Sequence, residues 1–544
     1  MDERRNMMKT RRSGLLILLA LSSSAVAQHD PGRNAVRLLA LDKTDAAIEL
    51  VEKNQQHKMN SPIDDAERCF VLSMAACQRD DAAAAFNYAQ QAVDNGLSIE
   101  RLHAGPREIL EPLYAHNEFK EWIKTRQKQL LHGPLLGSVT DASARFWVRT
   151  ADETDVQIMV QAVSKNGPTS DPFIGNARTS SAADHTATIL ISGLRPNTEY
   201  RYNVRVNSEE TGPTFGFRTF PKQATPSRFS IAFGGGAGFT PQYERMWTTI
   251  DKRDVSALLL LGDNVYIDDP VHPLTQRYCY YRRQSRPEWK QLVASTSVYS
   301  IYDDHDFGIN DCIPGPDIEI PKWKREVWNI FTQNWNNPAY GGGRKQPGCW
   351  YDFHIGDVHF IMLDGRYYRD LKGGSMLGAA QKAWLFESLK SSAGKFKVLA
   401  SPVPWSPGVK RSKDTWDGFP EEREEIFSFI ETHHIGGVLL MAADRHRTDL
   451  RKIERANGYD LYEVMSSRLT NVHTHGLMEN AKGSEFIMGY NSKCSFGLIE
   501  FDTTVADPLI TYRIVNIDDE LIDSRSLKLS QLQHNQKMVP GRTR

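Results

Sequence analysis

The strongest constraint on the fold is a series of short aliphatic runs between residues 227 and 520. The runs that resemble strands most clearly are FSIAF, SALLLL, VYSIY, VHFIMLD, FKVLASPV, GGVLLMAA, YDLYEVM, FGLIEF and LITYRIV. Amphipathic stretches lie between several of them, for example at 380–389 and 421–430. Continuous apolar runs are typical of strands covered on both faces, and their alternation with helices indicates an α/β fold. We therefore predict an α/β domain over 225–524, with a mixed sheet or two sheets and helices outside.

Residues 132–224 are expected to form a separate, all-β domain. Five alternating runs, SARFWVRT, VQIMVQAV, ATILISGL, TEYRYNVRVN and TFGFRTF, are separated by Gly, Pro, Asn and Asp. Short strands at this spacing favour a small β-sandwich. The segment GLRPNTEYRYNVRV resembles the fibronectin type III pattern, with Tyr200 in the position of its tyrosine-corner residue. A scaffold is the preferred interpretation, because we find no chemistry in this part.

Residues 28–131 are expected to be helical. Apolar residues recur at helical spacing from Asp65 until the polar break at 78–81, and a second helix is predicted from Ala82 to Val93. The pair resembles one tetratricopeptide unit, but only one clear copy is present. It could be a docking surface for a protein partner. A helical cap on the downstream domains is the preferred interpretation.

The two ends of the chain suggest export and a loose tail. Residues 1–27 begin with basic residues, continue with an apolar run, and end in Ala25-Val26-Ala27. This is typical of a secretory signal peptide cleaved after Ala27. An uncleaved anchor is the alternative, and Arg11-Arg12 raises a twin-arginine signal. We expect a periplasmic, cell-surface or secreted protein without a membrane span, and a polar, loosely held tail over 525–544.

Composition excludes some classes of function. The chain has 66 Lys and Arg against 67 Asp and Glu, a net charge of −1, which gives no support for a general nucleic-acid or anionic-membrane binder. Six cysteines in 544 residues are too few for a disulfide-framework protein, although they could pair after export. Serine-hydrolase, P-loop and dinucleotide-binding signatures are absent at the strand-to-helix turns.

Polar clusters follow four of the predicted strands. They are Gly262-Asp263-Asn264, Asp303-Asp304-His305-Asp306, Asp364-Gly365-Arg366 and Asp444-Arg445-His446. In open α/β sheets, ligands bind beyond the carboxyl ends of the strands. A single aspartate there is usually a helix cap, but four such ends supply hard oxygen ligands and imidazoles together. This set is typical of a di-metal hydrolytic centre acting on a phosphate ester.

These motifs also carry a family resemblance. GDN at 262–264, DHD at 304–306 and DxH at 444–446 are similar to the metal-binding blocks of calcineurin-like metallophosphoesterases. The runs DDHDFGIND at 303–311 and LDGRYYR at 363–369 resemble the alkaline phosphatase D (PhoD-like) family more closely. That family places a small β-domain before its catalytic domain, which it builds as a β-sandwich flanked by helices. The resemblance covers about 133–515 and leaves the helical part outside.

The resemblance implies roles for individual residues. It implies metal ligands at Asp263, Asp304, Asn310, Asp444 and His446. It implies that His305 protonates the leaving oxygen or stabilises the transition state, and that Arg366 faces the substrate phosphate. Asn264 and Tyr266 would also lie at the substrate. The alternative for each is a supporting hydrogen-bonding role, and for Arg366 a structural ion pair.

Two departures from the family affect the expected metal. The family's first catalytic strand ends in a metal-binding Cys, where this chain has Gly234-Gly235-Gly236, and Leu274 aligns with its Tyr ligand. Asp, Asn and His ligands favour Ca²⁺, Mg²⁺, Mn²⁺ or Zn²⁺, and Fe is an alternative although the Cys and Tyr ligands that it has in the family are absent. The glycines could instead form a backbone nest for phosphate. A degenerate, weakly active relative is a further alternative.

The sequence thus favours an exported, metal-dependent phosphoesterase that hydrolyses phosphate mono- or diesters with a metal-activated hydroxide. The alternative is a non-catalytic protein that binds a phosphate-bearing ligand. His305 argues for the enzyme, because a pure binder needs no general acid. One further pair, His473 and His475, could supply ligands, although a surface turn is the preferred interpretation.

Overall fold

The computed structural model describes residues 30–56, 63–126, 128–164, 167–168, 171–410 and 412–534. The predicted leader over 1–27 and the last ten residues of the predicted tail lie outside this part. Among the described residues, no helix is both long and apolar enough to cross a bilayer. All six cysteines are described and none is paired, so the disulfides that the sequence allowed do not form.

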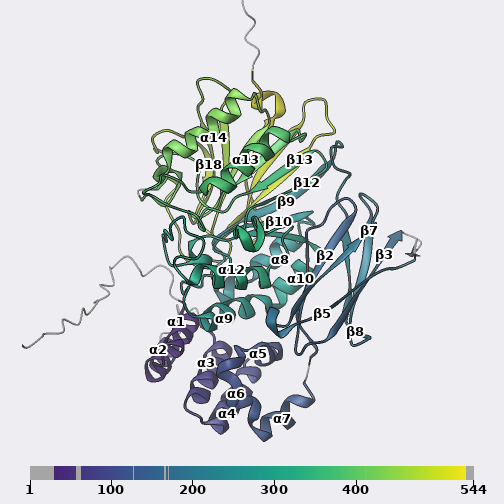
Figure 1. The fold of residues 1–544 in the computed structure, drawn as a ribbon, viewed down its shortest axis with the longest axis vertical. Coiled ribbons are helices and arrows are strands. Elements are labelled where there is room, and N and C mark those ends of the chain that lie inside the picture. Colours follow the sequence, from purple (N-terminus) through teal and green to yellow (C-terminus); the bar gives the residue numbers. More distant parts are fainter. Residues whose placement is uncertain are drawn as a thin grey trace, which may run out of the picture.

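Seven helices form the N-terminal part of the described chain. They are α1 (Pro31–Ala40), α2 (Thr44–Gln56), α3 (Asp65–Gln78), α4 (Ala82–Asp94), α5 (Ile99–Ala104), α6 (Arg107–Ala115) and α7 (Asn117–Lys124). The predicted break between α3 and α4 is confirmed, and the Asp81 side chain caps α4 by accepting from the Ala84 N–H. These helices lie at one end of the molecule, where α1 packs against α9 (Pro273–Gln284) (Figure 1). The helical part therefore contacts the region that carries the predicted site.

A nine-stranded sheet forms one layer of the molecule. Its strand order is β21-β20-β19-β9-β10-β11-β1-β2-β6. The strands are β1 (Leu130–Gly137), β2 (Ser143–Thr150), β6 (Thr186–Ser192), β9 (Arg228–Gly234), β10 (Ala257–Leu261), β11 (Ser297–Ile301), β19 (Ser495–Asp502), β20 (Leu509–Asn516) and β21 (Leu521–Lys528). Strands β9, β10 and β11 are parallel neighbours, so their carboxyl ends meet at one edge.

A seven-stranded sheet forms the second layer, in the order β12-β13-β14-β15-β17-β16-β18. Its strands are β12 (Tyr351–Ile355), β13 (Val358–Met362), β14 (Phe396–Ala400), β15 (Val438–Ala442), β16 (Thr448–Ile453), β17 (Leu461–Ser466) and β18 (Glu485–Tyr490). β13, β14, β15 and β17 run parallel, and β10, β13 and β15 are buried along their whole length. The predicted mixed α/β fold with more than one sheet is confirmed.

Helices of this region cover the sheets and carry several of the loops. They are α8 (Arg245–Asp251), α9, α10 (Pro287–Ser295), α11 (Asp304–Phe307), α12 (Trp323–Asn334), α13 (Gly378–Ser391) and α14 (Pro420–Thr432). Helices α13 and α14 lie beside the seven-stranded sheet, whereas α8, α9, α10 and α12 lie nearer the N-terminal helices (Figure 1). Strands β12, β16, β18 and β21 were not predicted.

The β-rich part before residue 225 is not a self-contained sandwich. A third sheet contains β3 (Asp155–Ser164), β4 (Gly167–Pro168), β5 (Phe173–Arg178), β7 (Glu199–Val206) and β8 (Glu209–Arg218). The other strands of this part, β1, β2 and β6, continue the nine-stranded sheet, because β1 pairs in parallel with β11 at Gly137 and Val298. The Tyr200 hydroxyl accepts a hydrogen bond from the Arg195 N–H, the contact expected of a tyrosine corner.

The predicted loose tail begins later than residue 525. Strand β21 pairs with β20 as far as Lys528, and Leu532 is fully buried. Leu532 also accepts a backbone hydrogen bond from Gly437 at 2.6 Å. Polar composition misled the prediction, because an edge strand buries few side chains while its backbone is still paired.

Candidate active site

The turn after β10 presents Asp263 and Tyr266 on a strained backbone. Both residues have positive φ, 54° and 50°, a conformation that non-glycine residues rarely adopt away from functional sites. The Tyr266 hydroxyl donates to Asp263 Oδ2 at 3.0 Å. Asp263 is buried and its Oδ1 atom has no hydrogen-bond partner among the described residues. Burial raises the pKa of Asp263 well above its usual range.

Tyr266 also connects this turn to the end of the second sheet. Its hydroxyl lies 2.8 Å from His446 Nε2, and its ring stacks on His305 with the centroids 4.6 Å apart. The sequence placed Tyr266 at the substrate and aligned Leu274 with the family's Tyr ligand, which left that ligand missing. The structure corrects the alignment, because the Tyr266 hydroxyl lies between the Asp263 carboxylate and the His446 imidazole. The signal that the sequence analysis missed was a Tyr three residues after Asp263.

His305 lies at the end of a charged chain that begins in the N-terminal helices. Its Nδ1 atom bonds to Asp268 Oδ1, and Arg33 of α1 donates to the Asp268 carboxylate and to the Tyr266 carbonyl oxygen. Burial opposes a charge on His305, but Asp268, Asp304 and Asp263 outweigh it and hold its pKa well above the usual range. The imidazolium form can donate a proton. Neither Asp268 nor Arg33 was identified from the sequence.

Arg366 does not face an open pocket. Its guanidinium is fully buried and pairs with Asp303 through Nε. Its Nη1 and Nη2 atoms donate to the two carboxylate oxygens of Asp414 at 2.6 and 3.1 Å. Asp304 Oδ1 lies farther away, at 3.7 Å. The expectation that Arg366 contacts the substrate phosphate is therefore corrected, and the alternative of a structural ion pair describes it. The sequence could not separate the two, because both place an arginine after a strand.

The two predicted amides differ in their surroundings. Asn264 Nδ2 donates to the Ile301 carbonyl at 2.8 Å and to Asp306 Oδ2 at 2.9 Å, so it ties two strand ends together. Its buried Oδ1 has no hydrogen-bond partner among the described residues, and its contact with substrate stays a prediction. Asn310 is exposed in the turn after α11. The neighbouring Asp311 donates its N–H to Asp304 Oδ2 at 2.6 Å instead.

The predicted pair after β15 is split between two environments. Asp444 has φ of 66°, and its buried Oδ2 has no hydrogen-bond partner among the described residues, with Lys410 Nζ at 3.6 Å. His446 is buried, and its Nδ1 atom also has no hydrogen-bond partner among the described residues. Burial lowers the pKa of His446 well below the usual range. Between them, the partly buried side chain of Arg445 makes neither a hydrogen bond nor an ion pair with any described residue.

The glycine run fills a tight crossing between the sheets. A Cβ on Gly235 would lie 2.7 Å from the Ala443 Cβ and 2.9 Å from the Gly262 oxygen. The Gly235 N–H donates to Ser466 and the Ala237 N–H donates to Asp263 through their backbone oxygens. The Gly235 N–H is therefore already used, which removes one donor from the phosphate nest that the sequence allowed. A Cβ on Gly236, whose φ is 65°, would lie 2.8 Å from the Arg468 nitrogen.

Two histidines to which the family resemblance gives no role also reach this region. The loop after β17 brings His473 and His475 beside His446, and one ring nitrogen from each of the three lies within 4.8 Å of the others. Burial lowers the pKa of His475 to about 3 and also lowers that of His473, and the nearby Arg445 adds to both shifts. All three imidazoles are therefore neutral at pH 7. The loop is partly exposed, as the preferred interpretation of a surface turn expects, and it also places both imidazoles beside His446.

The donor set of the site fits a metal ion. Asp263 Oδ1, Asp444 Oδ2 and His446 Nδ1 are buried polar atoms left without partners, which costs about 1–3 kcal/mol each. An ion held among these three atoms would satisfy them. Asp263, Asp304 and His305 also offer ligand atoms within 4.8 Å of one another. Carboxylate, phenol and imidazole donors together suit a hard or borderline cation.

Comparisons with known proteins cover most of the described chain. Residues 231–483 match the family model described as PhoD-like phosphatase, and residues 127–225 match a domain of unknown function, DUF7800. Alkaline phosphatase D of Bacillus subtilis (strain 168) is 24% identical over 315 residues, which are 48% of this chain and 53% of that protein. The match thus spans about half the length of that relative. The resemblance predicted from the motifs is confirmed.

Two solved structures share the fold. A structure described as PhoD superposes with a TM-score of 0.62 at 17% identity and covers 73% of this chain and 90% of that one. The purple acid phosphatase PPD1 from yellow lupin (Lupinus luteus) seeds gives 0.56 at 12% identity, covering 73% of this chain and 75% of that one. At these identities the likeness establishes the fold alone.

Proposed function

Residues 231–483 belong to the PhoD-like phosphatase family, and on that premise we propose that this chain is a metal-dependent phosphoesterase. One observation carries the proposal. Asp263, Tyr266 and His446 form a continuous line of contacts at the carboxyl ends of β10 and β15, and two of the three have buried ligand atoms without partners. Binding sites of open α/β sheets lie at this edge.

The proposed metal ligands are Asp263, Tyr266, Asp444 and His446, with Asp304 close by. A bound ion would supply positive charge that stabilises charge developing on the phosphate oxygens. The predicted Ca²⁺, Mg²⁺, Mn²⁺ and Zn²⁺ remain candidates. Tyr266 adds a phenol donor that the sequence analysis had counted as missing, so a ferric ion becomes a stronger candidate than that analysis allowed, even without the Cys ligand.

His305 would act as the general acid. Asp268 holds the Nδ1 side of its ring, so the opposite nitrogen is the one that can deliver a proton to the leaving oxygen. Arg33 fixes Asp268 in turn, and the ring of Tyr266 stacked on His305 restricts its rotation. A binding protein would not need a proton donor held from three directions, which favours the enzyme over the non-catalytic alternative.

Arg445 takes the role that was first assigned to Arg366. Its guanidinium has no partner among the described residues and lies between Asp444 and His446 in the chain. A guanidinium can hold a phosphate oxygen through two parallel hydrogen bonds. The same arrangement serves mono- and diesters, and both remain proposed substrates.

Three further proposals concern the parts outside the site. The leader would direct export, and α1–α7 would form a cap and not a docking surface for a protein. The fibronectin-like strands would act as a scaffold.

The decisive experiment is hydrolysis of a chromogenic phosphodiester and monoester. The full chain is stripped of metal and Ca²⁺, Mg²⁺, Mn²⁺, Zn²⁺ or Fe³⁺ is restored one at a time. We expect one or more metals to restore turnover, and Asp263→Asn to lower kcat/KM by more than about 100-fold, beyond the range for residues that only support a ligand. The matched control is Asp254→Asn, which changes an exposed aspartate at the opposite ends of the strands. A folded chain without turnover under any metal would favour the binding protein.

A further inference from the structure

Three imidazoles meet at the edge of the proposed centre. His446 follows β15, and His473 and His475 come from the loop between β17 and β18. His473 Nε2 and His475 Nε2 lie 3.0 Å apart. The rings of His446 and His475 are 5.0 Å apart and nearly parallel, while the ring of His473 stands at 82° and 89° to them. His446 and His475 are therefore stacked, His473 stands at right angles to both, and one ring nitrogen from each of the three lies within 4.8 Å of the others.

The hydrogen bonds of these rings do not explain why they are together. No carboxylate or backbone oxygen bonds to a ring nitrogen of the three within the described chain, and the only protein contacts of these nitrogens are the Tyr266 hydroxyl and each other. Nδ1 of His446 and Nδ1 of His475 are buried without a partner there. Two neutral imidazole nitrogens that face each other can share one proton at most. Lone pairs of this kind are what a transition-metal ion binds.

The backbone holds the loop in place before any ion binds. The His475 N–H donates to the His446 carbonyl at 3.2 Å, and Asn491 Nδ2 donates to the His475 carbonyl at 2.9 Å. The His473 N–H donates to Asn471 Oδ1 at 2.9 Å. The loop is thus tied to residues beside β15 and at the end of β18. A site assembled on a fixed backbone loses less conformational entropy when it binds its ligand.

We propose that His446, His473 and His475 form a metal site of their own, which takes a divalent ion of the zinc class. Three imidazole nitrogens with a fourth position left open are a common zinc arrangement, and imidazole discriminates against Ca²⁺ and Mg²⁺. The site shares His446 with the proposed phosphoesterase centre and extends it by one ion. Its metal content can be measured whether or not the chain turns over a phosphoester.

The test compares metal content and spectra of the full chain and its variants. Protein stripped with a chelator is titrated with Zn²⁺, and separately with Co²⁺, whose visible absorption reports nitrogen ligands in a tetrahedral field. We expect His473→Ala/His475→Ala to bind one zinc equivalent less than the unmodified chain and to lose the cobalt band. Asp263→Asn should keep that band, because Asp263 belongs to the other centre. His433→Ala, an exposed histidine after α14, is the matched control.

Two outcomes would overturn the site. One is an unchanged zinc equivalence in the double variant, and the other is a cobalt band that Asp263→Asn removes and the double variant keeps. Single variants His473→Asn and His475→Asn guard against misfolding, because each keeps a polar side chain in the loop. Each should weaken zinc binding by more than about 10-fold while circular dichroism stays unchanged. If the unmodified chain binds this zinc equivalent but hydrolyses no phosphoester with any metal, the phosphoesterase proposal fails and the three-histidine site stands.

Discussion

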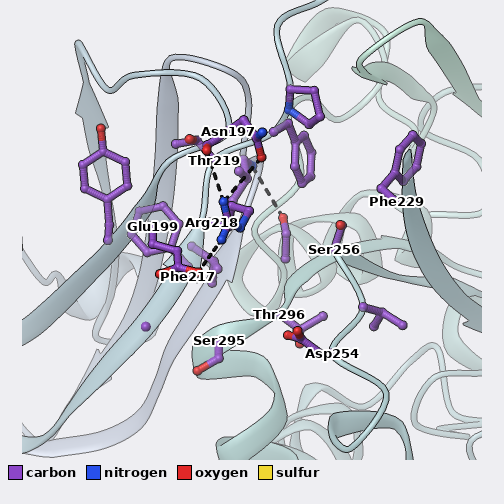
Figure 2. A pocket seen from close by; sticks show the side chains of 18 of the residues that line it. Asn197, Glu199, Phe217, Arg218, Thr219, Phe229, Asp254, Ser256, Ser295 and Thr296 are labelled. Atoms are coloured by element: carbon purple, nitrogen blue, oxygen red, sulfur yellow. Dashed lines mark hydrogen bonds and ion pairs between the residues drawn. The ribbon is translucent and has the colours of Figure 1, made fainter. Parts of the chain in front are cut away.

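The two ends of the parallel strands differ in what their polar groups do. At the carboxyl ends, Asp263 and Asp444 have positive φ and buried oxygens without partners. At the amino ends, a groove of about 740 Å³ lies between the third sheet and the first residues of β9, β10 and β11. There Arg218 donates to Asn197 and Glu199 (Figure 2). Thr219 donates to the backbone oxygen of Arg195.

This difference shows that a hollow and a chemical site are separate properties. None of the side chains lining the groove has a buried polar atom left without a partner in the described chain. Water can enter the groove and bond to its exposed groups, so nothing in it requires a ligand. The carboxyl ends leave lone pairs and charges unsatisfied. Unsatisfied polar atoms therefore distinguish the two ends of the strands and support the proposed site at the carboxyl ends.

The largest expected effect in this comparison is on stability. Arg366→Ala would leave the buried Asp303 without its cation, while Asp414 would keep Arg369 and Lys410, and should lower the free energy of unfolding by about 3–5 kcal/mol. Arg228→Ala, at the amino end, removes an ion pair with Glu500 in which the arginine side chain is 64% exposed, and should cost less than about 1 kcal/mol. Urea unfolding at one pH measures both. Equal losses would contradict the buried role of Arg366.

The next effect is on kcat and concerns Arg33, the residue of α1 that contacts Asp268. Arg33→Ala should lower kcat by about 10–100-fold with little change in KM, because Asp268 would no longer be fixed behind His305. Arg37→Ala changes an exposed arginine one turn along the same helix and should leave kcat unchanged.

Arg33→Lys distinguishes positioning from packing, because it keeps a charge near Asp268 and should recover part of kcat. If Arg33→Ala changes the melting temperature and not kcat, then α1 is only a cap.

A smaller effect concerns the pH dependence of stability and a buried carboxyl group in β17, both of whose oxygens accept hydrogen bonds. Glu463 of β17 accepts from the N–H groups of Trp405 and Ser406, and burial raises its pKa from 4.5 to about 7. A raised folded pKa means that its contribution to stability is complete below pH 4.5 and is lost as pH rises through 7.

Glu463→Gln should therefore flatten the dependence of the free energy of unfolding on pH between about 4.5 and 7. Glu485→Gln, an exposed residue of β18, is the control. Denaturant unfolding at several pH values measures the slope. A slope that Glu463→Gln leaves intact would assign the dependence to other groups.

The smallest effect belongs to the groove. Arg218→Ala removes hydrogen bonds that are exposed to solvent and should change stability by less than about 0.5 kcal/mol and kcat/KM by less than about two-fold. The same hydrolysis assay and melting curves test it. A larger fall in kcat/KM would give the groove a role in the reaction and would break the contrast between the two ends.

The sequence alone predicted the buried strands, the helix that begins after Asp81 and the aspartates at strand ends. Aliphatic runs such as 257–261 became buried strands, Asp81 capped its helix, and aspartates after strands reached the carboxyl edge. These outcomes follow because burial, capping and strand polarity depend on residues a few positions apart. Strand β21 and the continuation of β1 into the main sheet escaped prediction, because backbone pairing between distant segments leaves little trace in composition.

Tertiary structure alone decided which predicted residues meet. Arg366 and Arg445 both follow strands in the sequence, yet one is buried among carboxylates and the other is left without a partner. Arg33 reaches Asp268 across 235 residues, and His446 meets a loop that begins after the next parallel strand. The sequence by itself therefore determined the family, the α/β class and the acidic strand ends. The packing of distant segments decided which charges are paired inside and which remain available to a metal ion or substrate.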